Sequence, residues 1–269
     1  MSKTQPALLK YLKDEGREID FPLNVLRQFQ EFEKSVHSEM AGYDDLPESA
    51  AYGMRCFSQL RMFGMALGMS GEHEAAGRCL TQIMEDFNND SAFADGVTLH
   101  SWFLFNFPVS PGGPSIASEV LRKSPEFTGE LGPFVANANQ SRLGLYEVIK
   151  SMHDSCVITE LFTDRKILLN HSLETPPGNI ALIRVMKIKD DHVAFGDTNE
   201  FPAERKTTIQ GMVAQKMMVY FPERDPSKSY ETMMRLAGPY WFSIVARDYQ
   251  GDILDVDHYL SYYGGGESV

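Results

Sequence analysis

Apolar residues recur every three or four positions through the first half of the chain, which is the pattern of amphipathic helices. Prolines and glycines separate these runs, because proline suits the first turn of a helix and glycine often follows the last. The pattern predicts a series of helices, one of them capped by Ser115. Their residues are 6–15, 22–41, 47–69, 72–87, a short run ending at 107, 115–123 and 134–140.

The predicted helix over residues 47–69 contains three glycines, Gly53, Gly64 and Gly68. Each lowers the intrinsic helix propensity by about 1 kcal/mol relative to alanine. A glycine within a buried helix leaves room for a neighbouring element, so we interpret these positions as sites of close approach.

The hydrophobic period changes to that of β-strands at Leu143. Turn-forming residues separate the short apolar runs that follow, at His153–Asp154, Asp164–Arg165 and Asp190–Asp191. Five strands with short connections are typical of a small antiparallel barrel or a strongly curved sheet. The runs are LGLYEVIKSM, SCVITELFTD, KILLNHSL, IALIRVMKIK and HVAFG.

The last part of the chain is predicted to be helical again, with Ser227 or Ser229 as the cap of one helix and Pro239 at the start of another. The whole pattern predicts an α+β fold in three parts. These are an N-terminal helical domain, a small β-domain of antiparallel strands, and C-terminal helices with an acidic tail. Their residues are 1–142, 143–220 and 221–269.

The composition is that of an ordinary globular protein, with 43% apolar and 23% charged residues. The net charge is -12 and no third of the chain is basic, which argues against binding to nucleic acid or to an anionic membrane. No apolar run approaches the ~20 residues of a membrane-spanning helix, and the N-terminus lacks a secretory signal pattern. Three widely spaced cysteines form neither a disulfide framework nor zinc-ligand pairs. We therefore expect a cytoplasmic protein without a bound metal or cofactor.

Between residues 95 and 202 the chain contains, in order, HSWFLFNFPVSPGG, SRLGLYEVIKS, ITELFTDRKILL, PPGNIALIRVMKI and HVAFG. This series resembles a region of uncharacterised bacterial proteins, in which a helical domain precedes a small β-domain, often upstream of a zinc-binding SEC-C motif. The resemblance implies this architecture and no reaction. The SEC-C cysteines are absent here, since no cysteine follows Cys156.

The densest polar cluster is DYQGDILDVDH, near the C-terminus. Carboxylates with a histidine can hold Mg²⁺ or Mn²⁺ for hydrolysis, because hard cations prefer oxygen ligands. The spacing does not match an EF-hand loop, and a run of acidic residues is also typical of a solvated end. The candidate ligands are Asp248, Asp252, Asp255, Asp257 and His258.

The sequence contains no nucleophile elbow, no P-loop and no dinucleotide-binding glycine motif. We therefore expect a non-catalytic interaction or adaptor protein that presents an acidic surface to a protein partner, whose identity the sequence does not indicate. The alternative is a metal-dependent hydrolase that uses the C-terminal acidic cluster.

Overall fold

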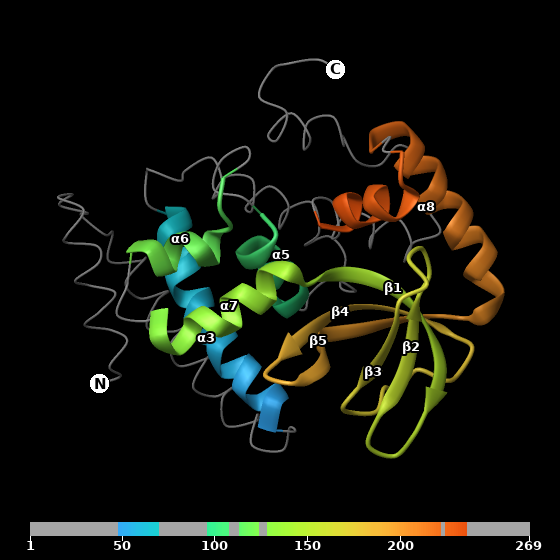
Figure 1. The fold of residues 1–269 in the computed structure, drawn as a ribbon, viewed down its shortest axis with the longest axis horizontal. Helices are drawn as coiled ribbons and strands as arrows, with labels where there is room; N and C mark the ends of the chain where they lie inside the picture. The colour runs from blue at the N-terminus through green and yellow to red at the C-terminus, as the bar shows by residue number, and fades with distance from the viewer. Residues whose placement is uncertain (1–47, 70–95, 108–112, 124–127, 222–223, 236–269) are drawn as a thin grey trace.

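The computed structural model describes residues 48–69, 96–107, 113–123, 128–221 and 224–235. Within them the chain has an α+β fold, in which helices pack on one face of a curved five-stranded sheet (Figure 1). This confirms the fold class predicted from the change of hydrophobic period. Several predicted helices lie outside the described residues, namely 6–15, 22–41, 72–87 and the one that begins at Pro239.

Four described helices precede the sheet. They are α3 (Glu48–Met69), α5 (Gly96–Phe105), α6 (Ile116–Lys123) and α7 (Thr128–Gln140). The hydroxyl of Ser115 accepts a hydrogen bond from the backbone N–H of Ser118 at 3.2 Å. Ser115 therefore caps α6, as predicted.

The sheet is antiparallel, with the strand order β3-β2-β1-β4-β5. Its strands are β1 (Arg142–Ser151), β2 (Cys156–Glu160), β3 (Lys166–Leu169), β4 (Ile180–Ile188) and β5 (Asp191–Phe201). All five predicted strands are confirmed. The register shifts between Val148 and Lys150 and between Leu182 and Arg184, and such irregularities bend the strands and increase the twist of a sheet.

The hairpin between β4 and β5 turns one residue earlier than predicted. Its tight turn consists of Lys189 and Asp190, with Lys189 at a φ of 55°, instead of Asp190 and Asp191. Lys187 consequently pairs with His192. Because a slip of one residue moves every side chain to the other face of a strand, this correction decides which residues meet on each face.

The curved sheet buries apolar side chains on both of its faces. The outer face packs against the helices, whereas the inner face is enclosed by the curl of the sheet itself. The backbone N–H of Asn170, just after β3, donates to the carbonyl of His192 on β5 at 3.0 Å, which brings the two edge strands together. The buried apolar residues of the inner face are Tyr146, Val148, Cys156, Ile158, Ile167, Leu169, Leu173, Ala181, Ile183 and Val185.

Gly53 allows α3 to lie directly against the outer face of the sheet. A Cβ atom at this position would overlap the terminal methyl group of Ile188 and would lie 3.4 Å from the ring of Phe195. The interpretation of Gly53 as a site of close approach is therefore confirmed. Phe57, one turn further along α3, packs edge-on against the same Phe195 ring at a centroid distance of 5.4 Å.

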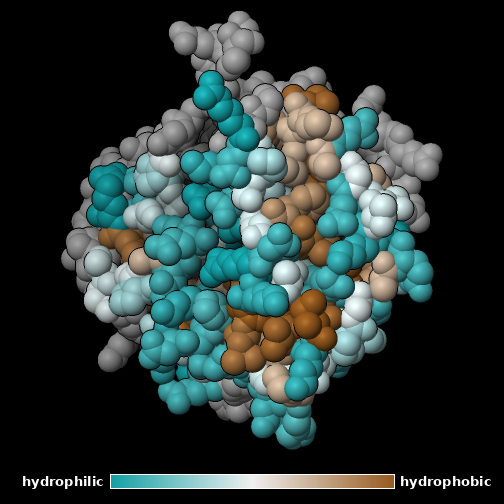
Figure 2. All heavy atoms as spheres, turned by 45° about the vertical axis from the view of Figure 1, so that its right-hand side comes forward, coloured by the Kyte–Doolittle hydropathy of each residue, from teal (hydrophilic) through white to brown (hydrophobic). Residues whose placement is uncertain are grey.

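Two helical segments follow the sheet. A short 3₁₀ helix (Ala203–Arg205) leads into α8 (Lys206–Tyr220), and residues 226–235 form a further helix. The sequence did not predict α8, because its apolar residues point in different directions. Ile209 and Val213 are buried, whereas Met218 and Val219 are exposed. Apolar patches do lie at the surface on the side of the molecule where α8 is found (Figure 2).

The helix over residues 226–235 begins earlier than predicted. A side-chain oxygen of Asp225 accepts a hydrogen bond from the backbone N–H of Ser227 at 2.9 Å, and Pro226 occupies the first turn. The prediction that Ser227 or Ser229 is the cap is therefore wrong. Asp225 takes that role, because a carboxylate accepts from the free N–H groups at a helix start and proline is well suited to the position that follows.

Candidate functional site

The site predicted from the sequence lies outside the described residues. Asp248, Asp252, Asp255, Asp257 and His258 all follow residue 235, so the metal-site hypothesis stays a prediction. Within the described part of the chain, no group of three or more His, Cys, Asp and Glu side chains is placed to hold a metal ion. None of the helices described is both long enough and apolar enough to cross a membrane.

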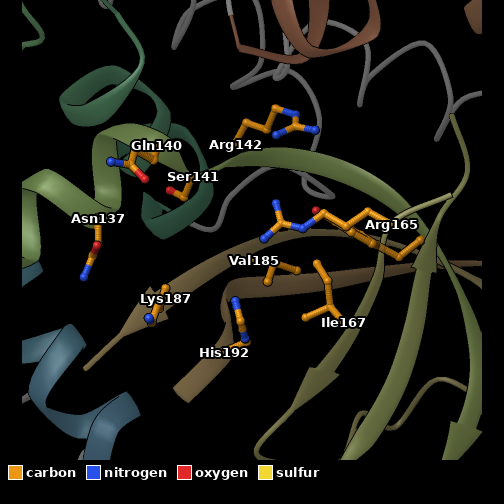
Figure 3. Close-up of a pocket in the computed structure, with 10 residues that line it drawn as sticks. Asn137, Gln140, Ser141, Arg142, Arg165, Ile167, Val185, Lys187 and His192 are labelled. Atoms are coloured by element: carbon orange, nitrogen blue, oxygen red, sulfur yellow. The ribbon is translucent and has the colours of Figure 1, made fainter. Parts of the chain in front are cut away.

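A pocket of about 160 Å³ opens between the C-terminal end of α7 and the inner face of the sheet (Figure 3). Its position follows from the chain, since α7 leads directly into β1 at Ser141. Four of the residues that line it have basic side chains, although the chain as a whole is acidic. They are Arg142, Arg165, Lys187 and His192.

Strand pairing places Lys187 and His192 side by side. The two residues are directly opposite each other in the β4–β5 pair, and Val185 and Ala194 form the equivalent pair two positions further into the sheet. Side chains two residues apart on a strand share a face, so Lys187 and His192 continue the row that contains buried Val185. Both therefore stand where the inner face meets the pocket.

Arg165 reaches the pocket from the other side of the curled sheet. It follows Asp164, whose positive φ of 53° helps to reverse the chain between β2 and β3. The carbonyl of Arg165 accepts a hydrogen bond from the backbone N–H of Glu160 at 2.9 Å, which holds this turn closed. The guanidinium extends across the inner face towards Ser141 and Val185 (Figure 3).

Arg165 and Lys187 carry positive charges that no carboxylate in the described part of the chain neutralises. Neither side chain forms a hydrogen bond or an ion pair with the described residues. The pKa of His192 is lowered, first by partial burial and then by the charges of Arg165 and Lys187, while Asp191 acts in the opposite direction. The imidazole of His192 therefore lies in a local field that is positive.

Arg142 differs from these residues because its charge is already balanced. Its Nη2 donates to both carboxylate oxygens of Glu160 at 3.0 Å and to a carboxylate oxygen of Glu231 at 3.2 Å. Glu160 is buried in the sheet, whereas Glu231 belongs to the helix over residues 226–235. This ion-pair cluster ties the helix to β1 and fixes one wall of the pocket.

Two buried tyrosines stand beside this ion-pair cluster. Burial, and then the negative charge of Glu160, raises the pKa of Tyr146 and that of Tyr230 well above the usual value of a phenol. Both phenols are therefore neutral at physiological pH. The hydroxyl of Tyr230 accepts a hydrogen bond from the backbone N–H of Leu145 at 2.8 Å, and Tyr146 lines the pocket.

The α7 side of the pocket is held by a buried guanidinium. Arg184 of β4 donates to the hydroxyl of Ser141 at 2.9 Å and to the side-chain oxygen of Asn106 at 2.6 Å. Burial lowers the pKa of Arg184 to about 9, which leaves it charged at neutral pH. The hydroxyl of Ser141 itself donates to the carbonyl of Ala138 at 2.6 Å, so its proton is already engaged.

This arrangement is suited to holding an anion. The described lining offers guanidinium, ammonium, imidazole and amide donors and contains no carboxylate. Hydrogen bonds from charged donors are roughly twice as strong as those between neutral groups. The same lining contains no thiol, and its aliphatic hydroxyl, on Ser141, is committed to other partners. The described part of the lining therefore presents charged donors without a free thiol or aliphatic hydroxyl beside them.

None of these pocket residues belongs to a sequence motif that predicts a ligand. His192 is one of seven histidines that share no motif, and Arg165 belongs to a predicted turn. The signal that could have linked them is the pairing of Lys187 with His192, which depends on placing the β4–β5 turn to within one residue.

Comparison of the chain with protein-family models, with curated proteins and with solved structures gave no match. The resemblance to bacterial proteins that carry a SEC-C motif therefore stays a prediction.

Proposed function

We propose that this chain is a non-catalytic binding module that recognises an anionic group in the pocket between α7 and the inner face of the sheet. The observation that carries this proposal is the pair formed by Arg165 and Lys187. These cations come from opposite sides of the curled sheet and line one pocket without a described carboxylate partner. Both charges act on His192, which lines the same pocket, so an anion bound there would be attracted by each of them.

The net charge of the chain narrows the class of ligand. A long polyanion such as nucleic acid would be repelled by a surface whose net charge is -12. A single anionic group meets mainly the pocket, because charges further away than the Debye length of about 8 Å are screened at physiological salt. The proposed ligand is therefore a small anion, or one anionic side chain of a protein partner.

Two double variants with the same net charge test the proposal. Arg165→Gln with Lys187→Gln removes the two unpaired pocket cations. The control, Lys150→Gln with Lys166→Gln, removes two exposed lysines of β1 and β3. Lys166 directly follows Arg165 in the sequence, but its side chain lies on the other face of β3. Each variant is titrated at low salt with acetate, citrate, sulfate and inorganic phosphate by isothermal calorimetry.

We expect the parent protein and the Lys150/Lys166 variant to bind at least one of these anions with a saturable isotherm. Affinity should fall at least tenfold in the Arg165/Lys187 variant, because each lost bond to a charged donor contributes about 1.5–3 kcal/mol and about 1.4 kcal/mol corresponds to a factor of ten. Equal weakening in both variants would mean that only net charge matters. That result, or no saturable binding of any of the four anions, would overturn the proposal.

A further inference from the structure

The pocket is large enough for one small oxyanion. Its volume of about 160 Å³ exceeds that of a phosphate or sulfate group, whose four oxygens are bonded to one central atom and which is therefore smaller than five separate water molecules of about 30 Å³ each. The remainder of a larger ligand would extend from the mouth of the pocket into solvent.

The donors approach this space from several directions. Arg165 reaches in from the turn before β3, Lys187 and His192 stand on β4 and β5, and the amides of Asn137 and Gln140 lie on the α7 side (Figure 3). A planar carboxylate presents its two oxygens in one plane and is satisfied by a single guanidinium fork. A tetrahedral group presents oxygens to several sides at once, which matches donors that come from two strands, a turn and a helix.

We infer that the anion is a dianionic tetrahedral oxyanion, supplied in the cell by a phosphoryl group, and that it binds to Arg165, Lys187 and the protonated imidazole of His192. This inference rests on the proposed function and adds two statements to it, the chemical class of the ligand and the uptake of a proton on binding. The proton comes from solvent and resides on His192 while the anion is bound.

The charged groups around His192 explain this coupling. Lys187 faces it from β4, Arg165 faces it from the turn before β3, and Asp191 precedes it on β5. His171, after β3, accepts a hydrogen bond at Nε2 from the backbone N–H of Ala194 and so is occupied as an acceptor. In the empty pocket the two cations disfavour a third positive charge. A bound dianion reverses the sign of the local field and favours the imidazolium.

Calorimetry with sulfate tests the proton uptake. Sulfate stays fully ionised near neutral pH, so any proton that is taken up when it binds is taken up by the protein. Titrations at pH 7 in two buffers of different ionisation enthalpy give the number of protons taken up. We expect an uptake approaching one proton in the parent and in His153→Gln, an exposed histidine outside the pocket, and none in His192→Gln. The affinity of the parent should fall by up to tenfold per pH unit on the alkaline side, and that of His192→Gln should not.

A second set of titrations distinguishes the sources of the phosphoryl group. The probes are glycerol 3-phosphate, a short peptide with one phosphoserine, and the same peptide with unmodified serine. Binding of both phosphorylated probes, with at least a tenfold preference over acetate, is the expected result for a pocket that recognises the phosphoryl group itself. A preference for the peptide over glycerol 3-phosphate would assign the group to a protein partner, and the reverse would assign it to a free metabolite.

Failure of this inference can be distinguished from failure of the proposed function. Acetate binding as tightly as sulfate, or no proton uptake with sulfate, would overturn the inference while the Arg165/Lys187 pocket still bound anions. An absence of saturable binding by every probe would overturn both.

Discussion

Replacement of Glu160 by glutamine should destabilise the fold and strengthen anion binding at the same time. Glu160 is 1% exposed and accepts two hydrogen bonds from Arg142 and a further one from the hydroxyl of Thr163. A glutamine has nearly the same shape but offers one acceptor oxygen where the carboxylate offers two. Arg142 and Thr163 would then compete for one oxygen inside the sheet.

The size of the effect follows from the burial of each partner. Breaking a buried ion pair on one side costs about 3–5 kcal/mol, because the remaining charge is left in a poorly solvated place. Arg142 would retain Glu231, whose side chain is 51% exposed, so we expect a loss near the lower limit, about 3 kcal/mol. Glu231→Gln is the matched control. It removes the exposed half of the same cluster and should cost less than about 1 kcal/mol.

The second effect of Glu160→Gln concerns the pocket. Arg142 lines it, and its charge is balanced mainly by Glu160. A unit charge 4 Å from a ligand is worth about 1 kcal/mol in water and about 4 kcal/mol at an effective dielectric constant of 20. Glu160 does not itself line the pocket, so loss of its negative charge should tighten sulfate binding by up to about fivefold, the equivalent of about 1 kcal/mol.

Urea unfolding followed by circular dichroism gives the free energies of unfolding, and calorimetry with sulfate gives the affinities. Equal destabilisation by Glu160→Gln and Glu231→Gln would refute the assignment of Glu160 as the principal partner of Arg142. Weaker sulfate binding by a folded Glu160→Gln variant would refute the placement of Arg142 in the wall of the pocket.

Three further predictions concern the scaffold. Gly211→Ala, on an open part of α8, should raise the free energy of unfolding by up to about 1 kcal/mol, because alanine has the higher helix propensity. Gly53→Ala should not raise it, because overpacking against the sheet costs about 1–3 kcal/mol. Urea unfolding of both variants checks this. Tyr230→Phe should cost about 1–3 kcal/mol and speed amide exchange at Leu145, whose buried N–H loses its acceptor. Burial lowers the pKa of His171 below 6.5, so the unfolded chain binds more protons at this residue than the folded chain does. The contribution of His171 to the free energy of unfolding should therefore be complete above pH 6.5 and decrease below it. His171→Gln should flatten the plot of stability against pH in this range.

The strands were predictable because each carries its own signal. Short apolar runs separated by turn-forming residues locate all five strands within residues 142–201. Short connections explain the antiparallel pairs β1–β2, β2–β3 and β4–β5, whereas the pairing of β4 with β1 does not follow from them. Helix α8 has no comparable signal. Its apolar residues lie on both sides, with Val213 buried and Met218 exposed, so the pattern indicated neither a strand nor an amphipathic helix.

The pocket could not be predicted because it depends on contacts that are far apart in the sequence. Arg165 meets Lys187 and His192 only because the sheet curls until the end of β3 reaches β5. A turn placed one residue later, at Asp190 and Asp191, would bring Lys189 opposite His192 and leave Lys187 to pair elsewhere. In the structure Lys189 forms an ion pair with Glu48 of α3, on the opposite side of the sheet from the pocket.

The acidity of the chain and its cationic pocket act over different distances, and together they define a selective site. The repulsion from a net charge of -12 acts on every part of a long polyanion that approaches the surface. The attraction of Arg165 and Lys187 acts over a short distance, on a group that enters the pocket. A ligand with one compact anionic group therefore gains the attraction and avoids most of the repulsion. Because the side chains of Arg165 and Lys187 are both exposed, added salt should screen their charges and weaken sulfate binding, and the slope of affinity against salt concentration should be smaller in the Arg165/Lys187 variant.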